Sequence, residues 1–172
     1  MALQIANHKV IGTAVVVLSG RIVLGEESSA LRATVNALLA SGTKKIILNV
    51  DRVEYIDSAG LGILVAMSRV AKSHGALLAL SNLGSHFEEV MQITKLLTVF
   101  DTYKTEADAV LGMSKVADFH SIGELLKPLA DRVYHNNDDC APGREISAHD
   151  RREDASEYRL CGDCKMLNTQ GN

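Results

Sequence analysis

The chain has 172 residues, enough for one domain or for one domain with an appendage, since domains most often hold roughly 100–150 residues. No run approaches the roughly 20 apolar residues of a transmembrane helix and the start of the chain lacks a signal-peptide pattern, so we expect a cytoplasmic protein with no membrane partner. A formal net charge of −3 and few aromatic residues argue against a nucleic-acid partner.

Charge and cysteine are distributed unevenly along the chain. Up to Met113 we count 10 Lys and Arg against 10 Asp and Glu, and from Ser114 onward 8 against 11 in only 59 residues. All three cysteines and both prolines also lie in the second part. The sequence therefore predicts a domain over residues 1–113 and a C-terminal extension over residues 114–172. We expect the two units to be stabilised by different means.

Short apolar runs alternate with amphipathic helical segments in the first part. The runs Ala14–Leu18, Ile46–Val50 and Ala76–Leu80 suit strands that are buried on both faces. Helical periodicity covers residues 29–40 and 58–73, and each segment ends at a glycine, Gly42 or Gly75. This alternation indicates parallel strands joined by helical crossovers.

Weaker signals complete the first part. Gln4–Val10 predicts an edge strand and Thr98–Phe100 a brief one. Two further helices are expected around Phe87–Met91 and Ala107–Leu111. The sequence thus predicts an α/β domain with a mostly parallel sheet of four to five strands and covering helices.

The segment that opens the second helix carries the strongest functional signal. Ser58 stands where an N-cap belongs, and a capping hydroxyl would add about 1 kcal/mol of stability. Gly60 and Gly62 lie in the first turn, where each costs up to about 1 kcal/mol relative to alanine. Capping does not explain these glycines, so we interpret them as positions that leave the backbone open to a close-fitting partner.

An exposed hydroxyl at a helix start also suits phosphorylation. A phosphoserine adds about −1.5 to −2 charges at pH 7, which the free N–H groups and the helix dipole partly offset. The carboxylate of Asp57 beside a phosphate on Ser58 would make a concentrated negative patch. We therefore expect modification to repel a partner rather than to refold the domain.

Two enzyme classes lack their required residues. A dinucleotide-binding fingerprint would need a third glycine at position 65, which is Val65. A nucleophilic serine needs a base nearby, yet His74 is expected about 24 Å from Ser58 along the same helix. We therefore expect a non-enzymatic protein in which Ser58 is a substrate.

The run from Asp57 to Gly62, with Asn49-Val50, Val53, Tyr55 and Ile56 before it, resembles the hallmark segment of STAS-domain anti-sigma factor antagonists. The resemblance covers about the first two-thirds of the chain and implies a STAS-type fold. It also implies binding to an anti-sigma factor with serine kinase activity, phosphorylation of Ser58 by that kinase to dissociate the complex, a resetting phosphatase, and transcription as the output. The partner-binding residues carried over are Gly20, Arg21, Asp57, Ser58, Ala59, Gly60 and Gly62.

One position departs from the family pattern. After the glycine that matches Gly20 the family commonly has a variable residue, an aliphatic residue and an aspartate, but Val23 stands in the acidic position here. Either kinase recognition differs, or Ser58 is not phosphorylated. In the second case the protein would be a STAS interaction module in a signalling or transporter-associated complex.

The C-terminal extension carries residues typical of a zinc ribbon or knuckle. Cys161-Gly162-Asp163-Cys164 offers two thiolates at zinc spacing, with His135 and Cys140 as the other ligands and His149 as a rival for the fourth place. Structural zinc supplies folding energy to segments too short and polar for a good core. The alternatives are a disordered tail or a redox-active cysteine pair. A short helix is expected around Gly123–Val133.

Overall fold

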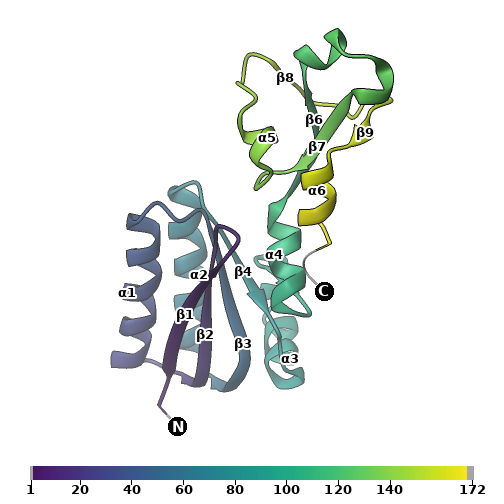
Figure 1. Cartoon of the computed structure of the whole chain (residues 1–172). Helices are drawn as coiled ribbons and strands as arrows, with labels where there is room; N and C mark the ends of the chain where they lie inside the picture. Colours follow the sequence, from purple (N-terminus) through teal and green to yellow (C-terminus); the bar gives the residue numbers. More distant parts are fainter. Residues whose placement is uncertain (1, 170–172) are drawn as a thin grey trace. The chain divides into compact units, whose positions relative to one another are not determined.

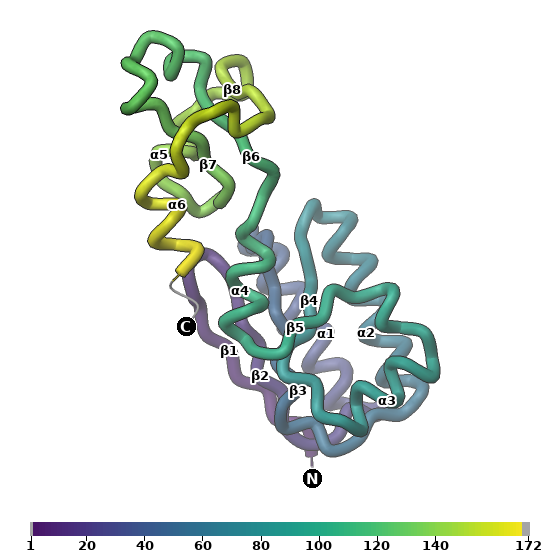
Figure 2. The backbone as a smooth tube through the Cα atoms, turned by 90° about the vertical axis from the view of Figure 1, so that its right-hand side faces the viewer, coloured from purple at the N-terminus to yellow at the C-terminus, as the bar shows by residue number. Residues whose placement is uncertain are grey.

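The computed structural model describes residues 2–169 and divides the chain into two compact units, residues 1–110 and 111–172 (Figures 1 and 2). Each unit has its own sheet, of five strands in the N-terminal unit and four in the C-terminal unit. Among residues 2–169, no helix combines the length and the apolar character needed to span a bilayer.

The N-terminal unit is built on a sheet with the strand order β1-β2-β3-β4-β5. Strand β1 runs antiparallel to β2, and the remaining neighbours are parallel, which confirms the predicted α/β fold with a mostly parallel sheet. The strands are β1 Gln4–Val10, β2 Thr13–Ile22, β3 Lys45–Ile56, β4 Leu77–Ser81 and β5 Asp101–Tyr103. The helices are α1 Glu26–Ala40, α2 Ser58–Ser73, α3 Ser85–Ile93 and α4 Glu106–Ser114.

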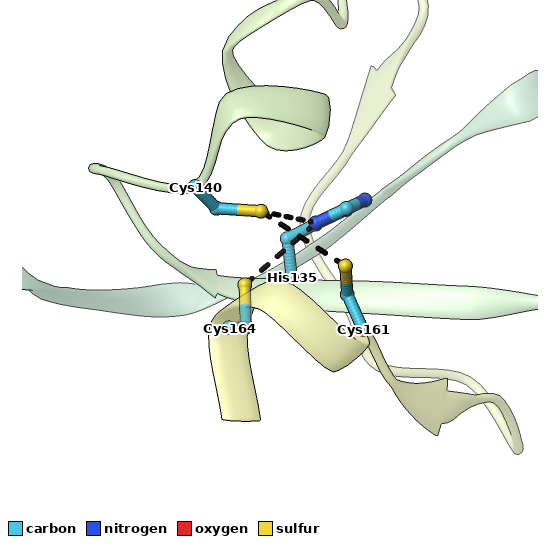
Figure 3. A group of neighbouring side chains, drawn as sticks. All are labelled: His135, Cys140, Cys161 and Cys164. Carbon is cyan, nitrogen blue, oxygen red and sulfur yellow. Dashed lines mark hydrogen bonds between the residues drawn. The ribbon is translucent and has the colours of Figure 1, made fainter. Parts of the chain in front are cut away.

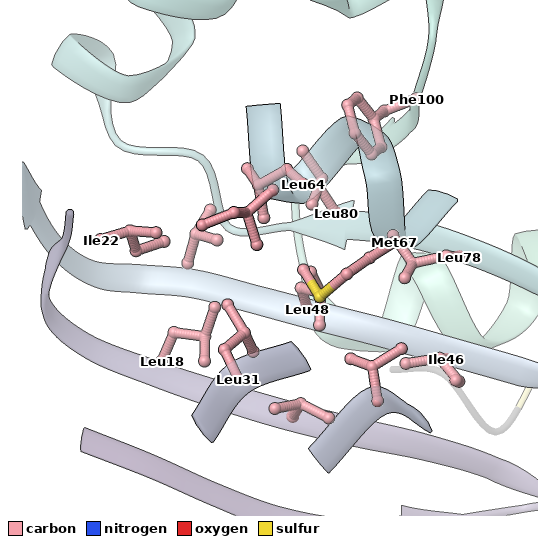
Figure 4. Packing of buried hydrophobic residues seen from close by; sticks show 14 of the residues in the cluster. Leu18, Ile22, Leu31, Ile46, Leu48, Leu64, Met67, Leu78, Leu80 and Phe100 are labelled. Carbon is pink, nitrogen blue, oxygen red and sulfur yellow. The ribbon is translucent and has the colours of Figure 1, made fainter. Parts of the chain in front are cut away.

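The main core fills one face of this sheet, beneath α1 and α2 (Figures 1 and 4). In α1 the residues at i, i+4 and i+8, namely Leu31, Val35 and Leu39, are buried, as the predicted amphipathic pattern requires. Leu64 of α2 and Leu48 of β3 belong to the same cluster. Both helices end where expected, since Gly42 (φ +85°) and Gly75 (φ +63°) take the left-handed conformation after the last turn.

The other face of the sheet receives the start of α4. Val15 and Ile47 pair across β2 and β3 and are buried outside the main core. On this face Glu106 accepts hydrogen bonds from Asn49 Nδ2 at 3.1 Å and from His8 Nε2 at 2.8 Å. These two bonds fix the first residue of α4 to the central strand β3 and the edge strand β1.

The predicted strand at Thr98–Phe100 is wrong. The chain forms a 3₁₀ turn, η1, over Leu96–Thr98, and β5 begins only at Asp101. Phe100 is apolar because its side chain enters the main core, where it is 4% exposed. An apolar run that anchors a turn therefore looked like a strand.

The C-terminal unit has a small sheet with the order β8-β6-β7-β9, so over residues 111–169 the extension is more regular than predicted. Its strands are β6 Lys115–Ser121, β7 Val133–Asn137, β8 Arg151–Arg152 and β9 Arg159–Leu160. Two short helices, α5 Ala141–Arg144 and α6 Gly162–Leu167, follow β7 and β9 respectively.

The predicted helix around Gly123–Val133 is also wrong. Two 3₁₀ turns, η2 Ile122–Leu126 and η3 Leu129–Asp131, occupy the segment before β7. Pro128 separates them, and Lys127 before it has extended backbone (φ −96°, ψ 155°). The proline ring disfavours helical backbone at the preceding residue, so one α-helix cannot run through this segment.

Strand β4 offers a matched test of the core. Leu80 is fully buried, whereas Leu77 in the same strand is 49% exposed. We expect Leu80→Ala to lower the free energy of unfolding by about 2–5 kcal/mol, and Leu77→Ala by about 1 kcal/mol. Urea unfolding of the full chain, followed by circular dichroism, measures both. Equal losses would contradict the core described above.

Candidate functional site

Helix α2 is capped by Asp57, which corrects the prediction that Ser58 is the N-cap. Asp57 has extended backbone (φ −94°, ψ 176°), and its Oδ1 accepts the N–H of Gly60 at 2.7 Å. The main-chain oxygen of Asp57 accepts the N–H of Leu61 at 3.0 Å. Ser58 is therefore the first helical residue, and its side chain is exposed rather than used for capping.

Asp57 also joins the start of α2 to the loop between β2 and α1. Its second carboxylate oxygen accepts the N–H of Leu24 at 3.4 Å, and its own N–H donates to the main-chain oxygen of Ile22 at 3.2 Å. Val23, the residue that departs from the family pattern, lies between these two contacts and is half-buried. The neutral side chain is thus located beside the helix start that carries Ser58.

The two glycines of the first turn have different roles. Gly60 is buried, and a Cβ there would lie 2.3 Å from the main-chain oxygen of Ile22 and 2.9 Å from Cγ1 of Ile56. The close packing of α2 on the end of β2 requires this glycine, so Gly60 is not an open contact position as predicted. Gly62 is exposed, a Cβ added there would have no neighbour within 4 Å, and the helix backbone is left accessible.

Of the two predicted contact residues in β2, one is buried and one is exposed. Gly20 is buried at a register irregularity and has φ +102°, so it shapes the strand and does not face outward as the contact prediction required. Arg21 is exposed, and its guanidinium lies 4.9 Å from the centre of the Tyr55 ring. Tyr55 is 42% exposed and Leu24 76% exposed. The sequence-based prediction did not include either residue among the contacts, although Tyr55 stands in the segment that resembles the family hallmark.

The exposed positions come from the ends of β2 and β3, the following loop and the start of α2. They are Arg21, Leu24, Tyr55, Ser58 and Gly62, here named the Ser58 surface. Asp57 and Ala59 are half-buried between them. Ligands and partners of α/β sheets commonly bind at the carboxyl ends of the strands, where these residues lie.

The C-terminal unit brings four of the predicted metal ligands together (Figure 3). One ligand atom from each of His135, Cys140, Cys161 and Cys164 lies within 4.8 Å of all the others, and all four residues are buried. His149, the rival ligand, has a side chain that is 92% exposed and pairs with Asp150, so it lies outside this cluster.

Burial shifts the pKa of Cys140 and of His135 in this cluster. It raises the pKa of the Cys140 thiol to about 12, against a hydrogen bond from the N–H of Gly143 that favours the thiolate. Burial also lowers the pKa of His135 below its ordinary value. A neutral imidazole is the form that ligates a metal, whereas the thiols must lose their protons to do so.

In a comparison with known protein families, residues 4–109 match the family model described as STAS domain. BtrV of Bordetella bronchiseptica, whose name designates it a candidate anti-sigma factor antagonist, is 26% identical over 98 residues, 57% of this chain and 84% of BtrV. The crystal structure of an anti-sigma factor antagonist from Mycobacterium paratuberculosis aligns with a TM-score of 0.58 at 23% identity, over 64% of this chain and 93% of that one.

The phosphorylated form of the Bacillus cell fate determinant SpoIIAA has a similar fold, with a TM-score of 0.50 at 24% identity. That alignment covers 63% of this chain and 96% of SpoIIAA. The family match ends at residue 109, so the cysteine-bearing unit lies beyond it.

The two first-turn glycines provide a second test. Gly60→Ala should destabilise the N-terminal unit by about 1–3 kcal/mol or more, because the new Cβ overlaps the main-chain oxygen of Ile22. Gly62→Ala should be neutral or stabilise α2 by up to about 1 kcal/mol through helix propensity. Urea midpoints measured by circular dichroism distinguish them. A Gly60→Ala protein as stable as the parent would refute the packing role.

Proposed function

The chain belongs to the STAS domain family, and from this premise we propose that it is an anti-sigma factor antagonist that binds through the Ser58 surface and is released by phosphorylation of Ser58. The observation that carries the proposal is the exposed Ser58 side chain on the first residue of α2, at the carboxyl edge of the sheet. Asp57 does the capping, so the Ser58 hydroxyl is available for modification.

The Ser58 surface has the character of a binding patch. The Arg21–Tyr55 cation–π pair provides a charged and aromatic anchor, of the residue types enriched at interface hot spots. Leu24 adds exposed apolar area on one side of Asp57. Gly62 lies one helical turn beyond Ser58 and lets a partner approach the helix backbone closely.

A phosphate on Ser58 would change the charge of this surface. The start of α2 already holds the carboxylate of Asp57, which engages the N–H groups of Gly60 and Leu24. A phosphoserine would add about −1.5 to −2 charges beside that carboxylate. This is more negative charge than the roughly +0.5 charge at the N-terminus of the helix can offset. The resulting negative patch would repel a partner that fits the unmodified surface and would speed its dissociation.

The relatives support this role by analogy. BtrV bears the name of a candidate anti-sigma factor antagonist, and SpoIIAA is a phosphorylated protein of this fold. The proposed partner is an anti-sigma factor with serine kinase activity, whose capture frees a sigma factor for transcription in the cytoplasm. In this scheme the chain is a kinase substrate and not an enzyme, and a phosphatase resets Ser58.

Binding should depend on charge at Ser58. We expect Ser58→Asp to weaken binding to a purified anti-sigma factor kinase from the same organism at least tenfold, and Ser58→Ala to bind like the parent, because only the first adds a negative charge. Calorimetry measures the dissociation constants. Ser73→Asp, the same change at the exposed far end of α2, should leave binding intact. Equal affinity of the two Ser58 variants would exclude charge repulsion.

Phosphorylation is tested by mass. Incubation of the full chain with that kinase and ATP should add one phosphoryl group, and Ser58→Ala should abolish the gain because it removes the acceptor oxygen. Intact-mass spectrometry gives the readout. Binding without any gain on the parent chain would instead support an unmodified STAS interaction module. A mass gain that persists in Ser58→Ala would show that another residue accepts the phosphoryl group.

A further inference from the structure

We propose that the C-terminal unit binds one structural Zn²⁺ ion through Nδ1 of His135 and the sulfur atoms of Cys140, Cys161 and Cys164, and that this ion forms the centre of its core. The site lies outside the residues matched to the STAS family and is independent of the function proposed for Ser58.

The ligand atoms have the spacing of a single tetrahedral ion. Bonds of about 2.3 Å to sulfur and about 2.0 Å to nitrogen, at tetrahedral angles, place two sulfurs about 3.8 Å apart and a sulfur and a nitrogen about 3.5 Å apart. Here Nδ1 of His135 lies 3.3 Å from Sγ of Cys140 and 3.7 Å from Sγ of Cys164. The sulfurs of Cys140 and Cys161 are 4.0 Å apart, and all three cysteines are free.

The backbone delivers the four ligands from four separate positions. His135 comes from β7 and Cys140 precedes α5, where it is the N-cap residue. Strand β9 pairs with β7 in parallel, and the N–H of Cys161 donates to the main-chain oxygen of Tyr134 at 2.9 Å. This bond sets Cys161 next to His135, and the first turn of α6 returns Cys164 to the same point. The convergence is therefore built into the hydrogen-bonded frame of the unit.

The surroundings hold the ligands in place. The ring of Phe119 packs on the ring of His135 at a centroid distance of 5.4 Å. A Cβ on Gly143 would lie only 3.1 Å from the Phe119 ring and 3.3 Å from the His135 ring, so the turn after Cys140 closes tightly over the imidazole.

The ligand set points to zinc in a structural role. Three thiolates and one imidazole in a tetrahedral arrangement are the Cys₃His set of structural zinc sites. The exposed fraction of each ligand residue is 8% or less. Four buried protein ligands leave no open position for substrate or water, which a catalytic zinc site keeps.

The unit also has little else to hold it together. Within residues 111–169, the buried apolar side chains other than the three cysteines are Met113 and Phe119. The half-buried side chains of Val133, Leu160 and Leu167 pack against the cysteines themselves. A core this small does not stabilise some 60 residues, and ion binding supplies the missing folding energy.

Metal analysis of the full-length protein tests the proposal. Protein purified without chelator should carry one zinc ion per chain, measured by elemental mass spectrometry. His135→Ala and Cys164→Ser should lose the ion, whereas His149→Ala, the same change at an exposed histidine, should keep it. His135→Cys should also retain zinc, because it converts the site to a Cys₄ set. Full zinc content in Cys164→Ser would overturn the assignment.

Cobalt provides a readout that does not depend on how the variants fold. Titration of the metal-free parent chain with Co²⁺ should saturate at one equivalent with intense visible bands and thiolate charge-transfer absorption, the signature of tetrahedral cobalt–sulfur coordination. A weak octahedral spectrum, or no saturation, would overturn the proposal.

Chelation tests the proposed role of the ion. Removing the ion should abolish amide-exchange protection of β6 and β7 while strands β2 and β3 keep theirs. Unchanged protection in the C-terminal unit would refute the structural role.

Discussion

The carboxylate of Asp57 fixes the arrangement on which the Ser58 surface depends. One oxygen caps α2 at the N–H of Gly60, and the other holds the β2–α1 loop through the N–H of Leu24. This double contact works only because Gly60 has no side chain, which lets the helix start lie against the main-chain oxygen of Ile22. The position of Ser58 therefore follows from a contact between segments far apart in the sequence.

In that arrangement, the residues that shape the backbone of the site differ from the residues that it exposes to a partner. Gly20 and Gly60 are buried and shape the backbone, whereas Arg21, Ser58 and Gly62 face outward. A modification of an exposed hydroxyl leaves the main core untouched, because that core consists of apolar side chains beneath α1 and α2. A switch at this place changes the charge presented to a partner and not the fold.

The two units differ in the side chains that they bury. The N-terminal unit buries apolar side chains from its strands and from α1, α2 and α3, and the hydrophobic effect stabilises this large core. Within residues 111–169, the C-terminal unit buries few apolar side chains, namely Met113, Phe119 and the three cysteines that lie around His135. The uneven distribution of charge and cysteine along the sequence corresponds to this contrast, since polar segments need a cross-link or an ion to fold.

The sequence alone determined the order of strands and helices in the N-terminal unit, the STAS resemblance and the candidate ligands His135, Cys140, Cys161 and Cys164, because periodicity, glycine stops and cysteine spacing are local properties. Tertiary structure decided the rest. It made Asp57 the cap, since the second carboxylate contact comes from a loop 33 residues away in sequence. It also required Gly60 through a distant carbonyl group and excluded His149 from the cluster. Such choices depend on contacts between distant segments, which no local pattern records.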